Sequence, residues 1–152
     1  MKTSVIQDFF SGTCDAEALA RDLAGCVVRT SHDVCTQYIE DDASGVIAVN
    51  TGDLLKMCDA FSSRHLNAAM IEQVAFALMA SDHFDWDHDT AEGKQVAEVV
   101  DWWDSPEINY PLTDSTMAKF RHYLQTGEDL FTQVDLVQPP TQAKPNMART
   151  KK

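Results

Sequence analysis

Apolar residues recur at helical spacing through most of this chain, and residues that begin or end helices separate the repeats. A spacing of i, i+3, i+4 and i+7 places side chains on one face of an α-helix. Two such sets are Ala16, Leu19, Ala20, Leu23 and Val96, Val99, Val100, Trp103. The pattern predicts a mostly α-helical fold, a single-domain bundle of about five to seven helices with little or no sheet.

The first two helices are predicted by the residues at their ends. Ser4 and Gln7 have the spacing of a capping box, and Gly12 fits the position just past a helix end. Thr13 would cap a second helix that ends before Gly25. The two together predict a helical hairpin at the start of the chain.

Two central helices follow. Asn50 or Thr51 would open one of them, and its apolar stripe is Leu54, Leu55, Cys58 and Phe61. The pattern from about Arg64 to Ala80 predicts the longest helix of the fold. Apolar residues lie on several sides of that helix, including Phe76, so we expect neighbours to cover it from several directions.

The last two helices end at clear signals. Ser105-Pro106 ends the helix that carries Trp103, because the residue before proline avoids helical angles. Thr113 would cap a final helix that runs to Gly127.

The segment from Cys26 to Asn50 leaves two alternatives open. Val27, Val28, Tyr38 and Ile39 would suit a short helix, whereas residues 45–49 would suit an extended segment.

Length and composition predict one helical domain over residues 1–137 and a disordered basic tail over 138–152. The tail contains three prolines and four basic residues and has no periodicity. The opening residues are not expected to form a secretory signal, and the sequence has no apolar run of about 18 to 20 residues, so we expect a cytoplasmic protein that does not contact the membrane. Its four cysteines form no C-x-x-C pair, which favours reduced thiols over zinc ligands or a disulfide framework.

Acidic residues are concentrated between Asp82 and Glu107. Nine acids stand there against one base, Lys94, with three tryptophans set among them. The formal net charge of the whole chain is -12. Like charges at this density repel one another, so the cluster predicts a positively charged partner. We expect no direct binding of nucleic acid, because contact with phosphates needs Lys and Arg at the surface and residues 1–137 contain few of them.

The same stretch contains an incomplete calcium motif. Asp85, Asp87 and Asp89 alternate as in the opening of a calcium loop, but Thr90 stands at the sixth position and Val96 at the twelfth. That motif needs glycine and glutamate there. We therefore predict no metal and no cofactor, and an acidic loop that caps the following helix. A metal-dependent sensor that uses residues 82–92 remains an alternative.

No sequence signature of catalysis is present. The chain has no G-x-S-x-G elbow, no H-E-x-x-H helix and no glycine-rich phosphate loop or dinucleotide fingerprint. We predict no catalytic residues and expect that the protein is not an enzyme.

Trp102 and Trp103 are adjacent on one helix and do not both point at one core. One of them should pack inward, and the other should pack under the loop 105–112 or stay partly exposed as an anchor for a partner, together with Tyr110.

Two segments carry a resemblance to a known family. The opening DFFSGTCDAEALARDL resembles the short helix, F-x-x-G turn and second helix that begin small bacterial toxin-immunity proteins of the colicin D immunity type. The later SPEINYPLT, followed by a helix ending in TGE, is similar to segments of immunity proteins from contact-dependent growth inhibition systems. Such proteins bind a toxin domain, often a nuclease with a basic cleft.

The resemblance and the charge lead to one hypothesis. The chain is expected to be an immunity protein that neutralises a basic toxin domain, and the acidic charge of the chain favours a nuclease as that toxin. A DNA-mimicking inhibitor or adaptor of another enzyme is the alternative. The residues predicted to bind the partner are Asp82, Asp85, Trp86, Asp87, Asp89, Glu98, Asp101, Trp102, Asp104, Glu107 and Tyr110.

Overall fold

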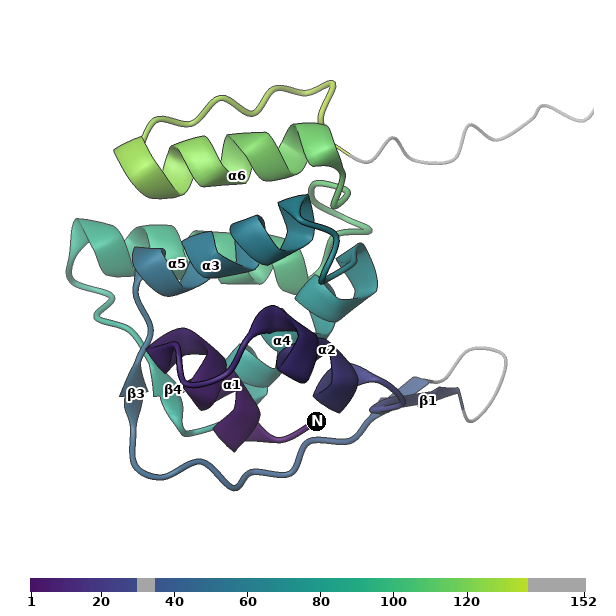
Figure 1. Cartoon of the computed structure of the whole chain (residues 1–152). Helices are drawn as coiled ribbons and strands as arrows, with labels where there is room; N and C mark the ends of the chain where they lie inside the picture. Colours follow the sequence, from purple (N-terminus) through teal and green to yellow (C-terminus); the bar gives the residue numbers. More distant parts are fainter. Residues whose placement is uncertain (30–34, 137–152) are drawn as a thin grey trace, which may run out of the picture.

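Six helices form most of the described part of the chain and pack into one domain with two small sheets (Figure 1). The computed structural model describes residues 1–29 and 35–136, without the side chains of Arg29 and Cys35. The helices are α1 (Thr3–Ser11), α2 (Ala16–Leu23), α3 (Thr51–Ser62), α4 (Ala68–Ala80), α5 (Ala91–Asp104) and α6 (Asp114–Thr126). This architecture confirms the predicted mostly α-helical single domain. The predicted disordered tail, residues 138–152, lies outside the described residues.

The core is built around α5. This helix packs against α4, α3 and α6, and α6 lies across α3 (Figure 1). The predicted stripe of α5 is fully enclosed, since Val96, Val99 and Val100 are 0% exposed and Trp103 is 1% exposed. The Trp103 ring meets the buried Phe120 ring of α6 edge to face, with 5.7 Å between the ring centroids. Trp103 is therefore the inward member of the tryptophan pair.

Most predicted helix ends are confirmed. Gly12 and Gly127 adopt the left-handed conformation after α1 and α6, with φ of 80° and 75°. Asn50 and Thr113 close capping boxes at the starts of α3 and α6. Two predicted caps are wrong by two residues each. The N-cap of α1 is Lys2 in place of Ser4, and that of α2 is Asp15 in place of Thr13.

The prediction for α4 is wrong at its start and on one side. The helix begins at Ala68, because the Asn67 side chain caps it by accepting a hydrogen bond from the Met70 amide at 3.0 Å. Arg64 has a φ of 66° and lies in the preceding turn. With 13 residues α4 is shorter than α5, which has 14. Its Phe76 side chain is 41% exposed, so the described residues do not cover that side of the helix.

The undecided segment contains short strands. Strands β1 (Val27–Arg29) and β2 (Cys35–Gln37) pair antiparallel, which excludes the helical alternative for Val27 and Val28. Strand β3 (Ile47–Ala48) pairs in parallel with β4 (Phe84–Asp85), which confirms the extended alternative there. The β1–β2 hairpin projects from the body of the molecule in Figure 1.

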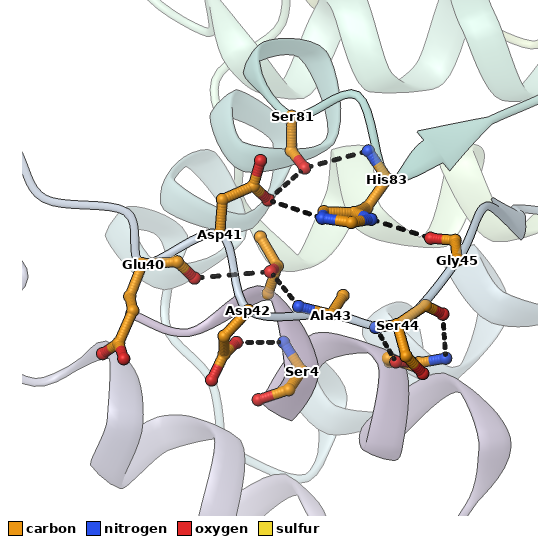
Figure 2. A network of polar contacts seen from close by, with 11 residues as sticks. Ser4, Glu40, Asp41, Asp42, Ala43, Ser44, Gly45, Ser81 and His83 are labelled. Atoms are coloured by element: carbon orange, nitrogen blue, oxygen red, sulfur yellow. Dashed lines mark hydrogen bonds and ion pairs between the residues drawn. The ribbon is translucent and has the colours of Figure 1, made fainter.

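Residues 40–45 are fixed by hydrogen bonds to distant parts of the chain (Figure 2). The Thr3 hydroxyl, 0% exposed, donates to the Glu40 carbonyl oxygen at 3.3 Å and accepts from the Ala43 amide at 3.0 Å. The Ser4 amide donates to the Asp42 carboxylate at 2.9 Å. These bonds hold an irregular segment against α1 and lead the chain to β3.

The helices of the described residues all fall short of the length and apolar character that a membrane span requires.

Gly93, in the first turn of α5, touches the preceding loop. A Cβ at this position would lie 1.8 Å from the Asp87 carbonyl oxygen. We expect Gly93→Ala to lower the free energy of unfolding by about 1 to 3 kcal/mol, because the loop must move to relieve the clash. Urea denaturation followed by circular dichroism measures the change. Gly52→Ala is the comparison: its added Cβ meets the Asn50 side-chain oxygen at 2.9 Å, and that flexible side chain can turn aside with the loss of its capping hydrogen bond, so we expect a smaller loss of about 1 kcal/mol. Equal losses in both variants would contradict the proposed backbone clash.

Candidate functional site

Four of the predicted carboxylates surround one hollowed surface beside β3 and β4. Two hollows of about 440 and 530 Å³ adjoin there, because both are lined by Val46, Asp85, Trp86 and His88. We call this region the Trp86 surface. Its members used below are Val46, Met79, Asp82, Asp85, Trp86, Asp87, His88 and Asp89.

Local hydrogen bonds fix the acidic loop of the Trp86 surface. The Asp85 carboxylate accepts from the Trp86 amide at 2.9 Å, and the Asp87 carboxylate accepts from the Asp89 amide at 3.0 Å. The Thr90 hydroxyl donates to the Asp87 carbonyl oxygen and accepts from the Gly93 amide, which caps α5. The predicted capping role of this loop is confirmed through Thr90, and hydrogen bonds hold the Asp85 and Asp87 carboxylates near a helix N-terminus, where negative charge is favoured.

The Trp86 surface combines apolar side chains with its carboxylates. Val46 is 71% exposed and Met79 is 52% exposed. The Trp86 ring is partly buried, and its centroid lies 5.8 Å from that of His88. The indole Nε1 of Trp86 is enclosed and has no hydrogen-bond partner among the described residues. Carboxylates beside an indole ring and exposed aliphatic groups suit a ligand that is both cationic and apolar.

The carboxylates of the stretch 82–107 have no cationic partner in the described part of the chain. The salt bridges that Lys and Arg form among the described residues all use acids outside this stretch. The pairs are Lys2 with Glu40 and Asp42, Lys56 with Asp53, Arg64 with Asp114, Lys119 with Asp135, and Arg121 with Asp59. Within the described residues no salt bridge offsets the negative charge of this stretch, whose single base is Lys94.

A second group of acids lies away from the Trp86 surface. Glu107 and Glu72 of α4 line a separate hollow of about 290 Å³. Burial raises the pKa of Glu72, and the charges of Glu107 and Asp104 raise it further. Burial likewise raises the pKa of Asp104, with added effects of Asp101 and Glu107. Apart from Glu98, the predicted acids thus divide between two regions, because α5 separates the loop at its start from the loop at its end.

Glu98, Trp102 and Tyr110 make contacts within the molecule. Glu98 accepts a hydrogen bond from the Tyr123 hydroxyl, and burial together with this bond raises the pKa of Tyr123 to about 12. Trp102 meets Tyr110 edge to face at 5.4 Å between centroids, and Phe131 at 5.6 Å. Trp102 is only partly exposed. These contacts give Trp102 and Tyr110 a packing role, with residues 127–131 folded back over them.

Ser81, Asp41 and His83 lie close together (Figure 2). Their hydrogen bonds connect them in a way that indicates a structural role and not a catalytic one. The Ser81 hydroxyl donates to Asp41 at 2.6 Å, and His83 Nε2 lies 3.7 Å from the same carboxylate. His83 Nδ1 is 2.7 Å from the Gly45 carbonyl oxygen, to which it donates. A nucleophile–base pair needs the imidazole bonded to the hydroxyl, and here the ring nitrogens face other groups. The trio instead ties residues 41–45 to the end of α4.

The described thiols are not activated. Cys26 and Cys58 are buried and Cys14 is partly exposed, and all three are free. Burial raises the pKa of Cys58 to about 12 and also raises those of Cys14 and Cys26. A thiolate is disfavoured at each of these positions.

Within residues 1–29 and 35–136, no group of three His, Cys, Asp or Glu side chains is arranged to hold a metal ion. The alternating aspartates of the loop do not converge on one point.

Sequence reasoning missed several residues of these surfaces. Val46 belongs to the undecided segment, and only the pairing of β3 with β4 brings it beside Trp86. The apolar pattern of α4 predicts that neighbours cover Met79, whereas its side chain is 52% exposed. Glu72 carried no local signal, because its neighbours Asp104 and Glu107 come from the far end of another helix.

Comparisons of the chain with protein-family models, with curated proteins and with solved structures gave no match in any of the three.

Removing the charge of Glu72 tests the cost of burying this carboxylate beside the charges of Glu107 and Asp104. A carboxyl whose folded-state pKa is raised destabilises the fold at pH values above that pKa, and the penalty disappears as the pH falls below the unfolded-state value. We expect Glu72→Gln to raise the melting temperature at neutral pH by about 1 to 3 °C. Calorimetry at neutral and acidic pH measures the difference, which should shrink toward zero in acid. A gain that persists in acid would contradict the electrostatic cause.

Trp102 tests whether the aromatic cluster is structural. We expect Trp102→Ala to lower the free energy of unfolding by about 3 kcal/mol, because it removes ring contacts from four neighbours. Trp102→Phe should cost about 1 kcal/mol, since it keeps an aromatic ring in the cluster. Chemical denaturation measures both. An unchanged stability of Trp102→Ala would return Trp102 to the role of a docking anchor.

Proposed function

We propose that this chain is an immunity protein that binds and neutralises a basic toxin domain through the Trp86 surface. The proposed toxin is a nuclease. The observation that carries the proposal is the set of four carboxylates, Asp82, Asp85, Asp87 and Asp89, held around an indole ring and exposed aliphatic side chains. None of the four forms a salt bridge within the described residues.

The charge of the Trp86 surface would raise its association rate with a basic partner. Opposite charges on two proteins steer their encounter and raise the association rate above the unsteered range of about 10⁵ to 10⁶ M⁻¹s⁻¹. An immunity protein must capture its toxin quickly, because the free toxin acts in the same cell. A nuclease supplies the complementary charge, since its cleft binds phosphates.

Apolar contact would hold the complex once it forms. Val46, Met79 and Trp86 offer a surface that a partner can dehydrate, and basic side chains would pair with the surrounding carboxylates. If a neutral partner covered the aspartates, their carboxylates would be desolvated without forming an ion pair. The cost of that desolvation disfavours a neutral partner.

The opening of the chain supports the same proposal. α1, the left-handed Gly12 and α2 form a helix–turn–helix hairpin of the kind that the resemblance to immunity proteins implies. Protection by binding needs no turnover.

The proposal predicts association kinetics that depend on salt and on specific charges. Candidate partners for the test are basic C-terminal domains of proteins encoded next to this chain, each purified as an inactive variant. We expect the double variant Asp82→Asn, Asp85→Asn to lower the association rate constant by about 3- to 10-fold at low salt, and added salt to narrow the difference. Biolayer interferometry at two salt concentrations measures these rates.

A matched variant controls for total charge. Glu17→Gln with Glu128→Gln also removes two charges, and both residues lie outside the Trp86 surface with a histidine as their ionic partner. This variant should associate at close to the native rate. Equal slowing by both double variants would show that net charge, and not the Trp86 surface, governs capture; an association rate insensitive to salt would refute the steering.

A further inference from the structure

The outward side of α4 is an exposed strip that begins at the Trp86 surface. Ala69, Glu72, Phe76 and Met79 follow one another at intervals of three or four residues, which places them on one side of the helix. Phe76 is 41% exposed and Met79 is 52% exposed. From Ala69 to Met79 the strip extends over ten helical rises, or about 15 Å along the helix axis at 1.5 Å per residue.

Hollows border this α4 strip along its length. Near the start of α4, Val27 and Gln37 of the β1–β2 hairpin and Phe76 line a hollow of about 290 Å³. A second hollow of the same volume is formed by Ala68, Glu72, Pro106, Glu107, Pro111 and Leu112. Met79, at the other end of α4, belongs to the Trp86 surface. The α4 strip therefore connects that surface with the second acidic group.

The chemistry of the α4 strip restricts what can cover it. Each small hollow lies just under the range of about 300 to 1,000 Å³ that is usual for small-molecule sites, so a side chain of a protein partner fits better than a cofactor. Covering Glu72 and Glu107 removes water from two carboxylates that already repel each other. A neutral or anionic occupant would leave them uncompensated. The occupant must bring apolar groups for Phe76 and Met79 and positive charge for Glu72 and Glu107.

We infer that a basic amphipathic helix of the protein partner docks along α4, with apolar side chains on Phe76 and Met79 and basic side chains at Glu72 and Glu107. A second helix matches the spacing of the α4 strip, because apolar side chains at helical intervals on both helices can interdigitate. This inference rests on the proposed function, since it gives the same partner a second contact next to the Trp86 surface.

A synthetic peptide tests the docking surface directly. The probe is an amphipathic peptide of about 14 residues, or about four turns, with leucines on one face and lysines on the other. It is titrated into the full-length ¹⁵N-labelled chain, and amide chemical shifts locate the binding. We expect the shifts to concentrate in residues 68–80 and 105–112. A control peptide with glutamates in place of the lysines should bind at least tenfold more weakly.

Two variants separate this surface from general stickiness. Phe76→Ser should weaken peptide binding at least fivefold with an unchanged melting temperature. Val134→Ser alters a side chain that is 84% exposed elsewhere, so it should leave peptide binding within twofold of native. Shifts centred away from α4, equal binding of the acidic peptide, or native affinity of Phe76→Ser would each overturn the inference.

The outcome is distinguishable from failure of the immunity proposal. Salt-dependent toxin capture without peptide docking on α4 would refute the docking inference alone. Peptide docking on α4 without toxin capture would refute the immunity function and leave a surface for basic helices.

Discussion

Helix α5 is held by apolar contact along one side, and both acidic regions are attached to its ends. Val96, Val99, Val100 and Trp103 are each no more than 1% exposed and pack against α3, α4 and α6. At its start, Thr90 and Gly93 lock the acidic loop in place; at its end, Asp104 leads into the loop that contains Glu107. A rigid buried helix thus fixes the distance between two groups of like charge, which a flexible chain would let drift apart.

The positions of the Lys and Arg residues determine which carboxylates are paired and which are not. Lys2, Lys56, Arg64, Lys119 and Arg121 are all engaged with acids outside the stretch 82–107. Most of these pairs join residues far apart in the chain, such as Arg64 with Asp114. The fold therefore neutralises one set of carboxylates and leaves another exposed to solvent. This division is what a charge-steered binding surface requires, and a uniformly acidic exterior would not provide it.

Residues near each helix end make the helical architecture predictable from the sequence. Contacts between residues far apart in the chain determine the path of residues 40–45 and the grouping of the acids. Gly12, Gly127 and Thr113 act through bonds within a few residues, so their roles were readable from the sequence. Residues 40–45 owe their path to Thr3 and Ser81, about 40 positions away, and no periodicity encodes such a path. The same limit applies to the acids. Nearness in sequence suggested one cluster, yet a helix of 14 residues separates its halves, and Glu72 joins one of them from another helix.

The three tryptophans occupy three different environments. Trp103 is sealed in the core, Trp102 lies within the aromatic cluster, and Trp86 borders the open hollows. The intrinsic fluorescence of the three tryptophans therefore reports on different parts of the molecule. Emission from Trp102 and Trp103 reports the integrity of the packed interior, while quenching or a spectral shift of Trp86 reports events at the surface. Replacing Trp86 with phenylalanine would yield a chain whose remaining indoles follow unfolding alone.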